Sequence, residues 1–300
     1  MKNAKFLISL YTCVILCISC STPTEPELYI ARDFTKENEF TAGIEGPVVD
    51  DRGILYAVNY EKEGTIGQVD SIGNVGLFVE LPEGSTGNAI CIDSKGNMLV
   101  ADYTGHNILS INQEKEISVY AHDTSMNQPN DIAITSKDIL YASDPDWSQS
   151  TGNLWMIKNG KVVLLELGMG TTNGIEVSPD EKKLYVNESV QRNVWVYDIL
   201  DNDSLTNKRL LIKFEDGGMD GMKCDVEGNL YITRYDKGVV VKVSPEGKVI
   251  KEIKLKGQKP TNIAFGGKEG KTAFVTMQDR GCIETFEVES PGRYFSLINQ

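Results

Sequence analysis

The fold is decided by a short pattern, of which one copy reads DGMKCDVEGNLYIT at residues 220–233. This copy begins with a polar residue, continues as a short alternating segment, passes a turn rich in Glu, Gly and Asn, and ends in an apolar run. Gly and Asn tolerate the positive φ angles of tight turns, so the pattern predicts a β-hairpin.

The same pattern occurs six times along the chain. The other five copies start at Glu45, Asn88, Asn130, Asn173 and Asn262, so that successive starts are 43, 42, 43, 47 and 42 residues apart. A period of about 40 to 45 residues built only from strands is typical of propeller blades, whereas helical repeats show apolar residues at helical spacing. We therefore predict an all-β fold, a six-bladed β-propeller.

Further strands are expected after each hairpin, which gives about four strands per blade. Examples are the segments 107–111, 117–120, 152–157 and 161–165. Residues 28–34 precede the first copy of the pattern. We expect this segment to supply an outer strand to the last blade, because it would close the ring and cover an exposed edge.

The first 27 residues are interpreted as an export signal and a tether. Lys2 and Lys5 precede an apolar run over residues 6–18, which is too short to span a bilayer. The run leads into C-I-S-C, which resembles a bacterial lipoprotein signal acylated at Cys20. We expect an exported, membrane-anchored lipoprotein facing the periplasm or the cell surface, with the export signal over 1–20, a polar tether over 21–27 and the propeller over 28–300.

The net charge of −13 argues against a nucleic-acid partner, because binding to phosphate backbones depends on Lys and Arg. Contact with a membrane is expected only through the N-terminal lipid. Cys91, Cys224 and Cys282 have spacings that match no metal-binding pair. We expect them to be small buried residues.

Residues at equal phase in the repeat should form a ring around the propeller axis, because the first strand of each blade lines that axis. The six ring residues are Glu45, Asn88, Asn130, Asn173, Asp220 and Asn262. All carry side-chain oxygens, and burying them is costly unless a cation or hydrogen-bond donors satisfy them. The ring predicts one divalent cation, with Ca²⁺ favoured and Zn²⁺, Mn²⁺ or Mg²⁺ as alternatives.

A simpler interpretation exists for some ring positions taken singly. Asn173-Gly174 and Asp220-Gly221 are dipeptides that also occur in ordinary turns. Turn chemistry does not require Glu45 or Asn130 at the same phase of the repeat, so the set as a whole favours a site.

Several motifs together resemble the SMP-30/gluconolactonase family, which includes regucalcin-like proteins. They are EGP at Glu45, PND at 129–131 followed by YASDP, NGIEVSPDEKKLYV at Asn173, DGMKCDVEGNLYI at Asp220 and NIAFGG at Asn262. The resemblance implies a metal-dependent lactonase in which Glu45, Asn173 and Asp220 are direct metal ligands. It also implies that Asn130 completes the site directly or through water or substrate.

An axial cation can polarise an ester carbonyl and lower the pKa of a bound water, which suffices for the hydrolysis of a small lactone or ester. Asp220 is the candidate catalytic base, with a role as ligand only as the alternative. The sequence lacks G-x-S-x-G, so a serine triad has little support. Loop and ring residues predicted to contact the substrate are Asn88, Tyr103, Asn130, Trp147 and Arg234.

One position departs from the family pattern. Animal members that act on sugar lactones carry Arg two residues before the third ring position, and this chain has Gln128. A charge-assisted contact with the substrate is therefore missing or supplied elsewhere. Two alternatives remain open: an organophosphatase or arylesterase on the same scaffold, and a non-enzymatic ligand-binding surface propeller with a structural ion.

Overall fold

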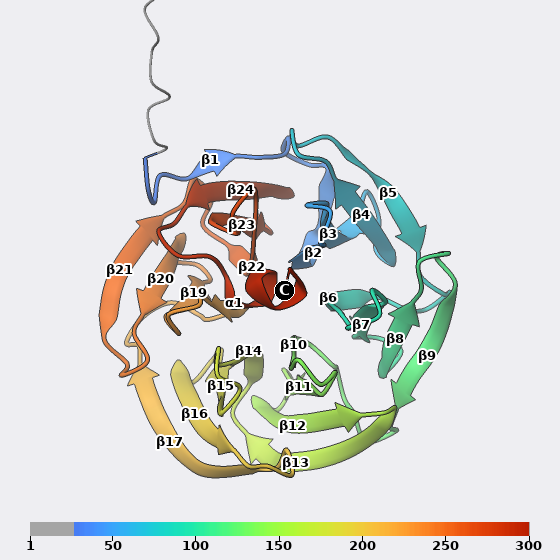
Figure 1. Cartoon of the computed structure of the whole chain (residues 1–300), viewed down its shortest axis with the longest axis vertical. Coiled ribbons are helices and arrows are strands. Elements are labelled where there is room, and N and C mark those ends of the chain that lie inside the picture. The colour runs from blue at the N-terminus through green and yellow to red at the C-terminus, as the bar shows by residue number, and fades with distance from the viewer. Residues whose placement is uncertain (1–26, 300) are drawn as a thin grey trace, which may run out of the picture.

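Six four-stranded antiparallel sheets surround a central axis in the computed structural model, which describes residues 27–299 (Figure 1). The predicted six-bladed β-propeller is confirmed. The export signal expected over 1–20 and all but the last residue of the tether lie outside the described residues. Within 27–299, no helix has the length and apolar character needed to cross a membrane.

Each copy of the repeat forms the two innermost strands of one blade. Blade one contains β2 (Phe40–Val49), β3 (Leu55–Tyr60), β4 (Thr65–Val69) and β5 (Val75–Glu80). Blade two contains β6 (Gly87–Ile92), β7 (Met98–Asp102), β8 (Asn107–Ile111) and β9 (Ile117–His122). Blade three contains β10 (Ile132–Ile134), β11 (Leu140–Asp146), β12 (Thr151–Lys158) and β13 (Lys161–Met169).

The second half of the chain continues the same order from the axis outward. Blade four contains β14 (Thr172–Val177), β15 (Lys183–Glu188), β16 (Asn193–Ile199) and β17 (Leu205–Lys213). Blade five contains β18 (Met222–Cys224), β19 (Leu230–Arg234), β20 (Val239–Val243) and β21 (Val249–Lys254). Blade six contains β22 (Pro260–Gly266), β23 (Thr272–Met277), β24 (Cys282–Glu287) and β1 (Arg32–Asp33).

The ring of blades is closed by the N-terminal segment, as the sequence predicts. β1 pairs antiparallel with β24, the third strand of the last blade. Arg280 reinforces this join, since its guanidinium lies 2.7 Å from Asp33, 2.7 Å from Glu37 and 2.6 Å from Glu284. Glu284 is fully buried, so Arg280 also compensates a charge that water does not reach.

The hydrophobic core lies between neighbouring blades. Val58 and Ile66 of blade one pack in the same cluster as Ile90 and Val100 of blade two. Similar clusters join the other blades because alternate residues of each strand face the adjacent sheet. The three cysteines predicted to be small buried residues, Cys91, Cys224 and Cys282, are indeed buried and form no disulfide.

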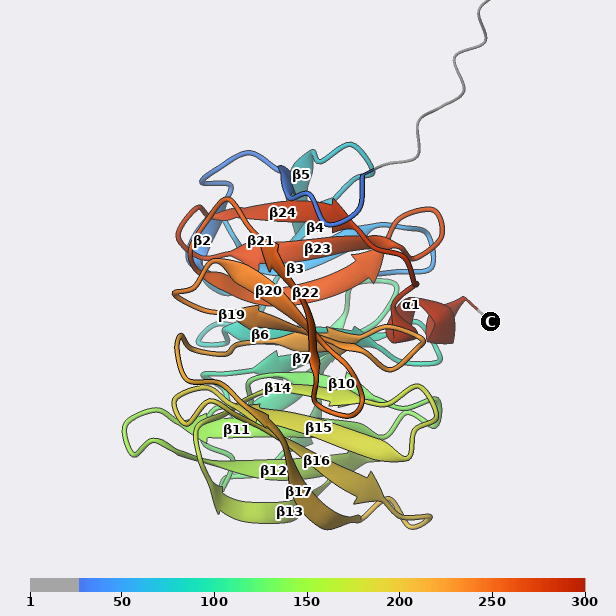
Figure 2. The same cartoon turned by 90° about the vertical axis from the view of Figure 1, so that its left-hand side faces the viewer.

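A short C-terminal helix, α1 (Arg293–Ile298), was not expected from the sequence. It lies over one end of the central axis (Figures 1 and 2). The Tyr294 hydroxyl accepts a hydrogen bond from the Ile92 amide at 2.6 Å and donates one to the Ile92 carbonyl at 2.8 Å. Arg293 donates to the Ile134 carbonyl at 2.9 Å, so α1 closes this end against two inner strands.

We expect Tyr294→Phe to lower the free energy of unfolding by about 1–3 kcal/mol, because the Ile92 amide and carbonyl lose a buried partner while the ring still packs. Urea unfolding of the two proteins measures this difference. Tyr120→Phe, which also removes one tyrosine hydroxyl from a partly buried ring, is the matched control and should be close to neutral. An unchanged stability of the Tyr294 variant would mean that α1 contributes little to closing the axis.

Candidate functional site

The ring residues are turned toward the axis by irregular pairing between the first two strands of each blade. Register shifts flank Glu45 and also fall at the positions that hold Asn88, Asn173 and Asn262. In blades three and five, the regular inner strand begins just after the ring residue, at Ile132 and Met222. Bulges of this kind re-aim side chains. Regular pairing resumes two residues after the ring residue in blades two to five but one residue after Asn262 in blade six, so Asn262 lies one position out of phase with the other ring residues.

Glycine follows the ring residue where adjacent blades come closest. A Cβ on Gly174 would lie 2.5 Å from the Asp220 carbonyl, and a Cβ on Gly221 would lie 2.0 Å from the Asn262 side chain. Gly46 also has a φ of +54°, a conformation that favours glycine. Asn173-Gly174 lies within β14 and Asp220-Gly221 directly precedes β18, so neither pair forms a hairpin turn.

In blades three to six, the second strand carries a polar side chain opposite the ring position that hydrogen-bonds to inner-strand backbone. The members of this clamp are Ser143, Asn187, Thr233 and Thr276, whereas Val58 and Ala101 hold the position in blades one and two. Thr233 Oγ1 lies 2.9 Å from the Thr261 carbonyl of the next blade. Asn187 Nδ2 donates to the Asp220 carbonyl at 2.6 Å, again across a blade boundary. The clamp therefore fixes the backbone that carries the ring.

Two of the predicted ring residues form hydrogen bonds with neighbouring ring residues. Asn262 Nδ2 donates to Glu45 Oε2 at 2.9 Å, while Asn262 Oδ1 accepts from the Ile263 amide at 2.9 Å. Asn88 Nδ2 donates to the Asn130 carbonyl at 3.2 Å. Both the nitrogen and the oxygen of the Asn262 side chain are thus engaged, which assigns it to positioning Glu45. The predicted contact of Asn88 with substrate stays a prediction.

Two other ring residues present side-chain oxygens that have no partner. Asn130 and Asn173 are 5% and 2% exposed, and their Oδ1 atoms form no hydrogen bond within the described chain. Buried polar atoms are almost always paired, so these oxygens fit a bound ligand. With the carboxylates of Glu45 and Asp220 they make an all-oxygen donor set, which suits a hard divalent cation.

The two histidines lie away from the ring. His106 and His122 are exposed on the β7–β8 loop and at the end of β9. Within residues 27–299, no three His, Cys, Asp or Glu side chains group so as to hold an ion. The four ring residues that could hold a cation, Glu45, Asn130, Asn173 and Asp220, do not form such a group because two of them are amides.

Burial destabilises the charged forms of both ring carboxylates. Burial raises the pKa of Asp220 to about 8; the charge of Asp131 adds to this, while hydrogen bonds with Asn173 and Glu45 oppose it. Burial likewise raises the pKa of Glu45 well above its ordinary value, and the charges of Asp220 and Asp131 add to the shift. A cation beside both groups would favour their ionised forms.

Three residues near the ring were missed as functional candidates by the sequence analysis. Asn187 is fully buried, and its Oδ1 has no partner within the described chain. Asp131, next to Asn130, has a buried carboxylate 3.5 Å from Lys223 Nζ. The sequence offered a signal for Asp131, because this residue directly follows a ring residue in the PND motif. Its pairing with Lys223 joins blade three to blade five, so no local sequence pattern indicates it.

The β7–β8 loop and the segment before Asn130 meet at the mouth of the ring. Tyr103 is half-buried; burial raises its pKa, and a side-chain hydrogen bond with Gln128 acts in the opposite direction. Asp144, fully buried, accepts hydrogen bonds from the Asn127 amide at 2.9 Å and Trp155 Nε1 at 2.8 Å. Tyr103 and Gln128 are therefore held as a polar pair close to the chain segment that leads into Asn130.

Two other residues predicted to contact substrate have different surroundings. Arg234 is fully buried, with its guanidinium 3.9 Å from the centre of the Phe214 ring and its Nε donating to the Gly218 carbonyl at 3.2 Å. The expected contact between Arg234 and a sugar is therefore wrong, because packing between blades occupies the side chain. Trp147 is 41% exposed on the β11–β12 loop, and its role stays a prediction.

Known proteins resemble this chain over much of its length. Gluconolactonase from Zymomonas mobilis is 28% identical over 216 residues, which cover 63% of this chain and 60% of the relative. Regucalcin from Xenopus laevis is 36% identical over 127 residues, covering 40% of this chain and 42% of the relative. The matches thus span about 40 to 60% of the length of these two relatives.

Solved structures show the same fold. A luciferin-regenerating enzyme superposes with a TM-score of 0.77 at 21% identity, covering 88% of this chain and 97% of the other. A calcium-binding regucalcin from Agrobacterium tumefaciens superposes with a TM-score of 0.75 at 21% identity, covering 84% of this chain and 92% of the other.

The family model described as the SMP-30/Gluconolactonase/LRE-like region matches residues 44–279. This range contains all six ring residues and every strand except β1, β24 and the beginning of β2. The chain therefore belongs to the SMP-30/gluconolactonase/LRE-like family.

Proposed function

We propose that this protein is a metal-dependent hydrolase that opens a small lactone. The observation that carries the proposal is the meeting of two carboxylates and two unpartnered amide oxygens on the propeller axis. Similarity to a gluconolactonase and to a 6-deoxy-6-sulfogluconolactonase from Pseudomonas putida supports a lactone as the substrate.

The residues that would hold the cation are Glu45, Asn130, Asn173 and Asp220. Ca²⁺ suits this set best, because it accepts carboxylate and amide oxygens in flexible geometries, and Mg²⁺, Mn²⁺ or Zn²⁺ are the alternatives. When bound, such an ion supplies Lewis-acid polarisation of an ester carbonyl and eases deprotonation of water. Asn262 would keep the Glu45 carboxylate oriented through its hydrogen bond of 2.9 Å.

Asp220 is proposed both as a ligand and as the group that accepts a proton from the attacking water. Asp220 is partly exposed as a residue, whereas Glu45 is buried, so Asp220 is the ring carboxylate closer to solvent. Burial raises the pKa of Asp220, and a bound cation would keep its carboxylate ionised and able to accept a proton.

The polar pair Tyr103 and Gln128 is proposed to contact the substrate, together with Asn88, Asn130 and Trp147. Gln128 and Tyr103 offer neutral hydrogen-bonding groups instead of a cation. This composition favours a neutral hydroxylated lactone over one that carries a carboxylate or phosphate near this side of the ring.

The first test is hydrolysis of a panel of lactones by metal-stripped and Ca²⁺- or Zn²⁺-reloaded protein. We expect turnover only with metal, and a fall of about 10²–10⁴-fold in kcat/KM for Asp220→Asn, because the base and one ligand charge are lost. Asp236→Asn removes an exposed carboxylate on the β19–β20 loop and is the matched control. Metal-independent turnover, or an Asp220 variant as active as the control, would contradict the proposal. Turnover of phosphoesters without lactones would favour the alternative hydrolase.

The second test is calcium binding by calorimetry. Glu45→Gln keeps the shape of the side chain but removes one charge, so we expect Ca²⁺ affinity to fall at least about tenfold. Glu269→Gln, an exposed carboxylate on the β22–β23 turn, should bind like the unaltered protein. Equal affinity of both variants would place the ion elsewhere.

The third test is the stability of the metal-free protein as a function of pH. Because the pKa of Asp220 is about 8 rather than its ordinary 3.8, the folded protein retains a proton that the unfolded chain releases between these values. The free energy of unfolding should therefore fall as pH rises from about 4 to about 8. Thermal melts should show a smaller fall for Asp220→Asn, and saturating Ca²⁺ should oppose it. The same slope in both metal-free proteins would contradict this assignment.

We further propose that the protein is exported and anchored through a lipid on Cys20, on the strength of the N-terminal sequence. Expressed in a bacterial host, it should fractionate with membranes and incorporate labelled palmitate. Cys20→Ala should abolish labelling, whereas Cys17→Ala should retain it. Persistent labelling of the Cys20 variant would contradict the anchor.

A further inference from the structure

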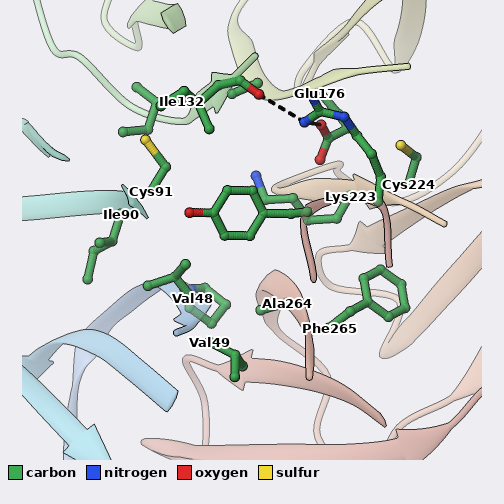
Figure 3. A pocket seen from close by; sticks show the side chains of 15 residues that line it. Val48, Val49, Ile90, Cys91, Ile132, Glu176, Lys223, Cys224, Ala264 and Phe265 are labelled. Atoms are coloured by element: carbon green, nitrogen blue, oxygen red, sulfur yellow. Dashed lines mark hydrogen bonds and ion pairs between the residues drawn. The ribbon is translucent and has the colours of Figure 1, made fainter. Parts of the chain in front are cut away.

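A lysine side chain extends into the axis of the propeller between the ring and α1. Lys223 lines a cavity of about 30 Å³ together with residues of the inner strands and of α1. Figure 3 shows Lys223 among the side chains that line this cavity. Much of the lining is apolar, including Ile90, Ile132 and Phe265. Only 16% of the Lys223 side chain is exposed, and a charged group at such a place is costly unless it compensates other charges.

The charge that Lys223 meets belongs to Asp131. Lys223 Nζ lies 3.5 Å from Asp131 Oδ1, and the Asp131 carboxylate is 1% exposed. Asp131 Oδ1 also accepts a hydrogen bond from the Ile132 amide at 3.0 Å. Asp131 directly follows the ring residue Asn130, so this ion pair lies immediately beside the proposed metal site.

Glu176 is a second acidic neighbour of Lys223. Glu176 lines the same cavity, its carboxylate lies 3.4 Å from Arg293 of α1, and the charges of Lys223 and Arg293 both lower its pKa against the effect of burial. Arg293 also lies 2.9 Å from Glu181, which is partly exposed at the closed end. Because Glu176 and Arg293 carry opposite charges, counting both leaves Lys223 as the cation that offsets the negative charge of the ring side.

The charge balance at the ring follows from these pairs. Glu45, Asp131 and Asp220 bring three negative charges, and Lys223 removes one, so two remain. A divalent cation would neutralise the site. Without Lys223 the same site would hold three negative charges and would favour ions of higher charge.

We propose that Lys223 is an internal counter-ion that sets the charge of the axial site for divalent rather than trivalent cations. The inference rests on the proposed metal site. Its physical basis is that the repulsion between Lys223 and a bound ion grows in proportion to the charge of that ion, so the ammonium disfavours a trivalent ion more than a divalent one.

The experiment compares Ca²⁺ with Tb³⁺, binding each to metal-stripped protein and measuring affinity by calorimetry. We expect Lys223→Met to bind Ca²⁺ at least about tenfold more tightly and Tb³⁺ at least about thirtyfold more tightly, since the electrostatic effect is one and a half times larger for the trivalent ion. Asp131→Asn should weaken both ions, again Tb³⁺ more than Ca²⁺.

Two further variants keep the test decisive. The double variant Lys223→Met/Asp131→Asn restores two net negative charges and should bind both ions nearly as the unaltered protein does. If Lys223→Met fails to fold, the affinities of the double variant and of Asp131→Asn are compared instead. Lys259→Met removes an exposed positive charge, which water screens, and should leave both affinities within about twofold.

If the unaltered protein binds Ca²⁺ but the affinities of the variants do not follow their net charge, the proposed role of Lys223 is wrong and the proposed metal site stands. Weaker binding by Lys223→Met would do the same. Failure of the unaltered protein to bind either ion would overturn the proposed metal site and this inference together.

Discussion

The structure depends on one constraint: polar side chains from six blades meet near one axis, where few backbone groups are free to form hydrogen bonds with them. Each unpartnered buried polar atom costs about 1–3 kcal/mol, and Asn130 and Asn173 each present one. Burial of the two carboxylates beside them adds a further cost, which appears as the raised pKa values of Glu45 and Asp220. The blades supply enough buried apolar surface to tolerate this cost, and the cost is also what makes the axis a place where a cation can bind.

Holding these side chains in place requires support from outside the ring. Thr261 Oγ1 donates to the Ile44 carbonyl at 2.9 Å, next to Glu45, and so joins the last blade to the first at the axis. At the rim, the same two blades are joined by β1 and Arg280. The contacts that close the propeller therefore also position the ring, because any opening between these blades would separate the ring residues. These contacts lie both at the axis and at the rim.

The repeat predicts the blades and the ring because both depend on local spacing. The ring positions recur at nearly the same phase, so residues far apart in the sequence, such as Glu45 and Asp220, could be placed together without coordinates. Contacts that cross blades leave no such signal. Lys223 occupies a position that alternation alone would assign to an ordinary strand, and α1 follows the last repeat without a periodic pattern. Arg234 illustrates the opposite error, since its loop-end position suggested substrate contact, whereas Phe214 packs over its guanidinium.

The two ends of the axis have different roles because of what fills them. At one end, α1 and Tyr294 leave a cavity of about 30 Å³, which holds no more than about two water molecules. At the ring, Asn88 and Asp220 remain partly exposed, and Tyr103 is half-buried beside Gln128. In the proposed function, the substrate would approach the ring from the side away from α1. Because the ion pair of Lys223 and Asp131 lies beside the cavity closed by α1, its charge would act on the proposed cation without obstructing that approach.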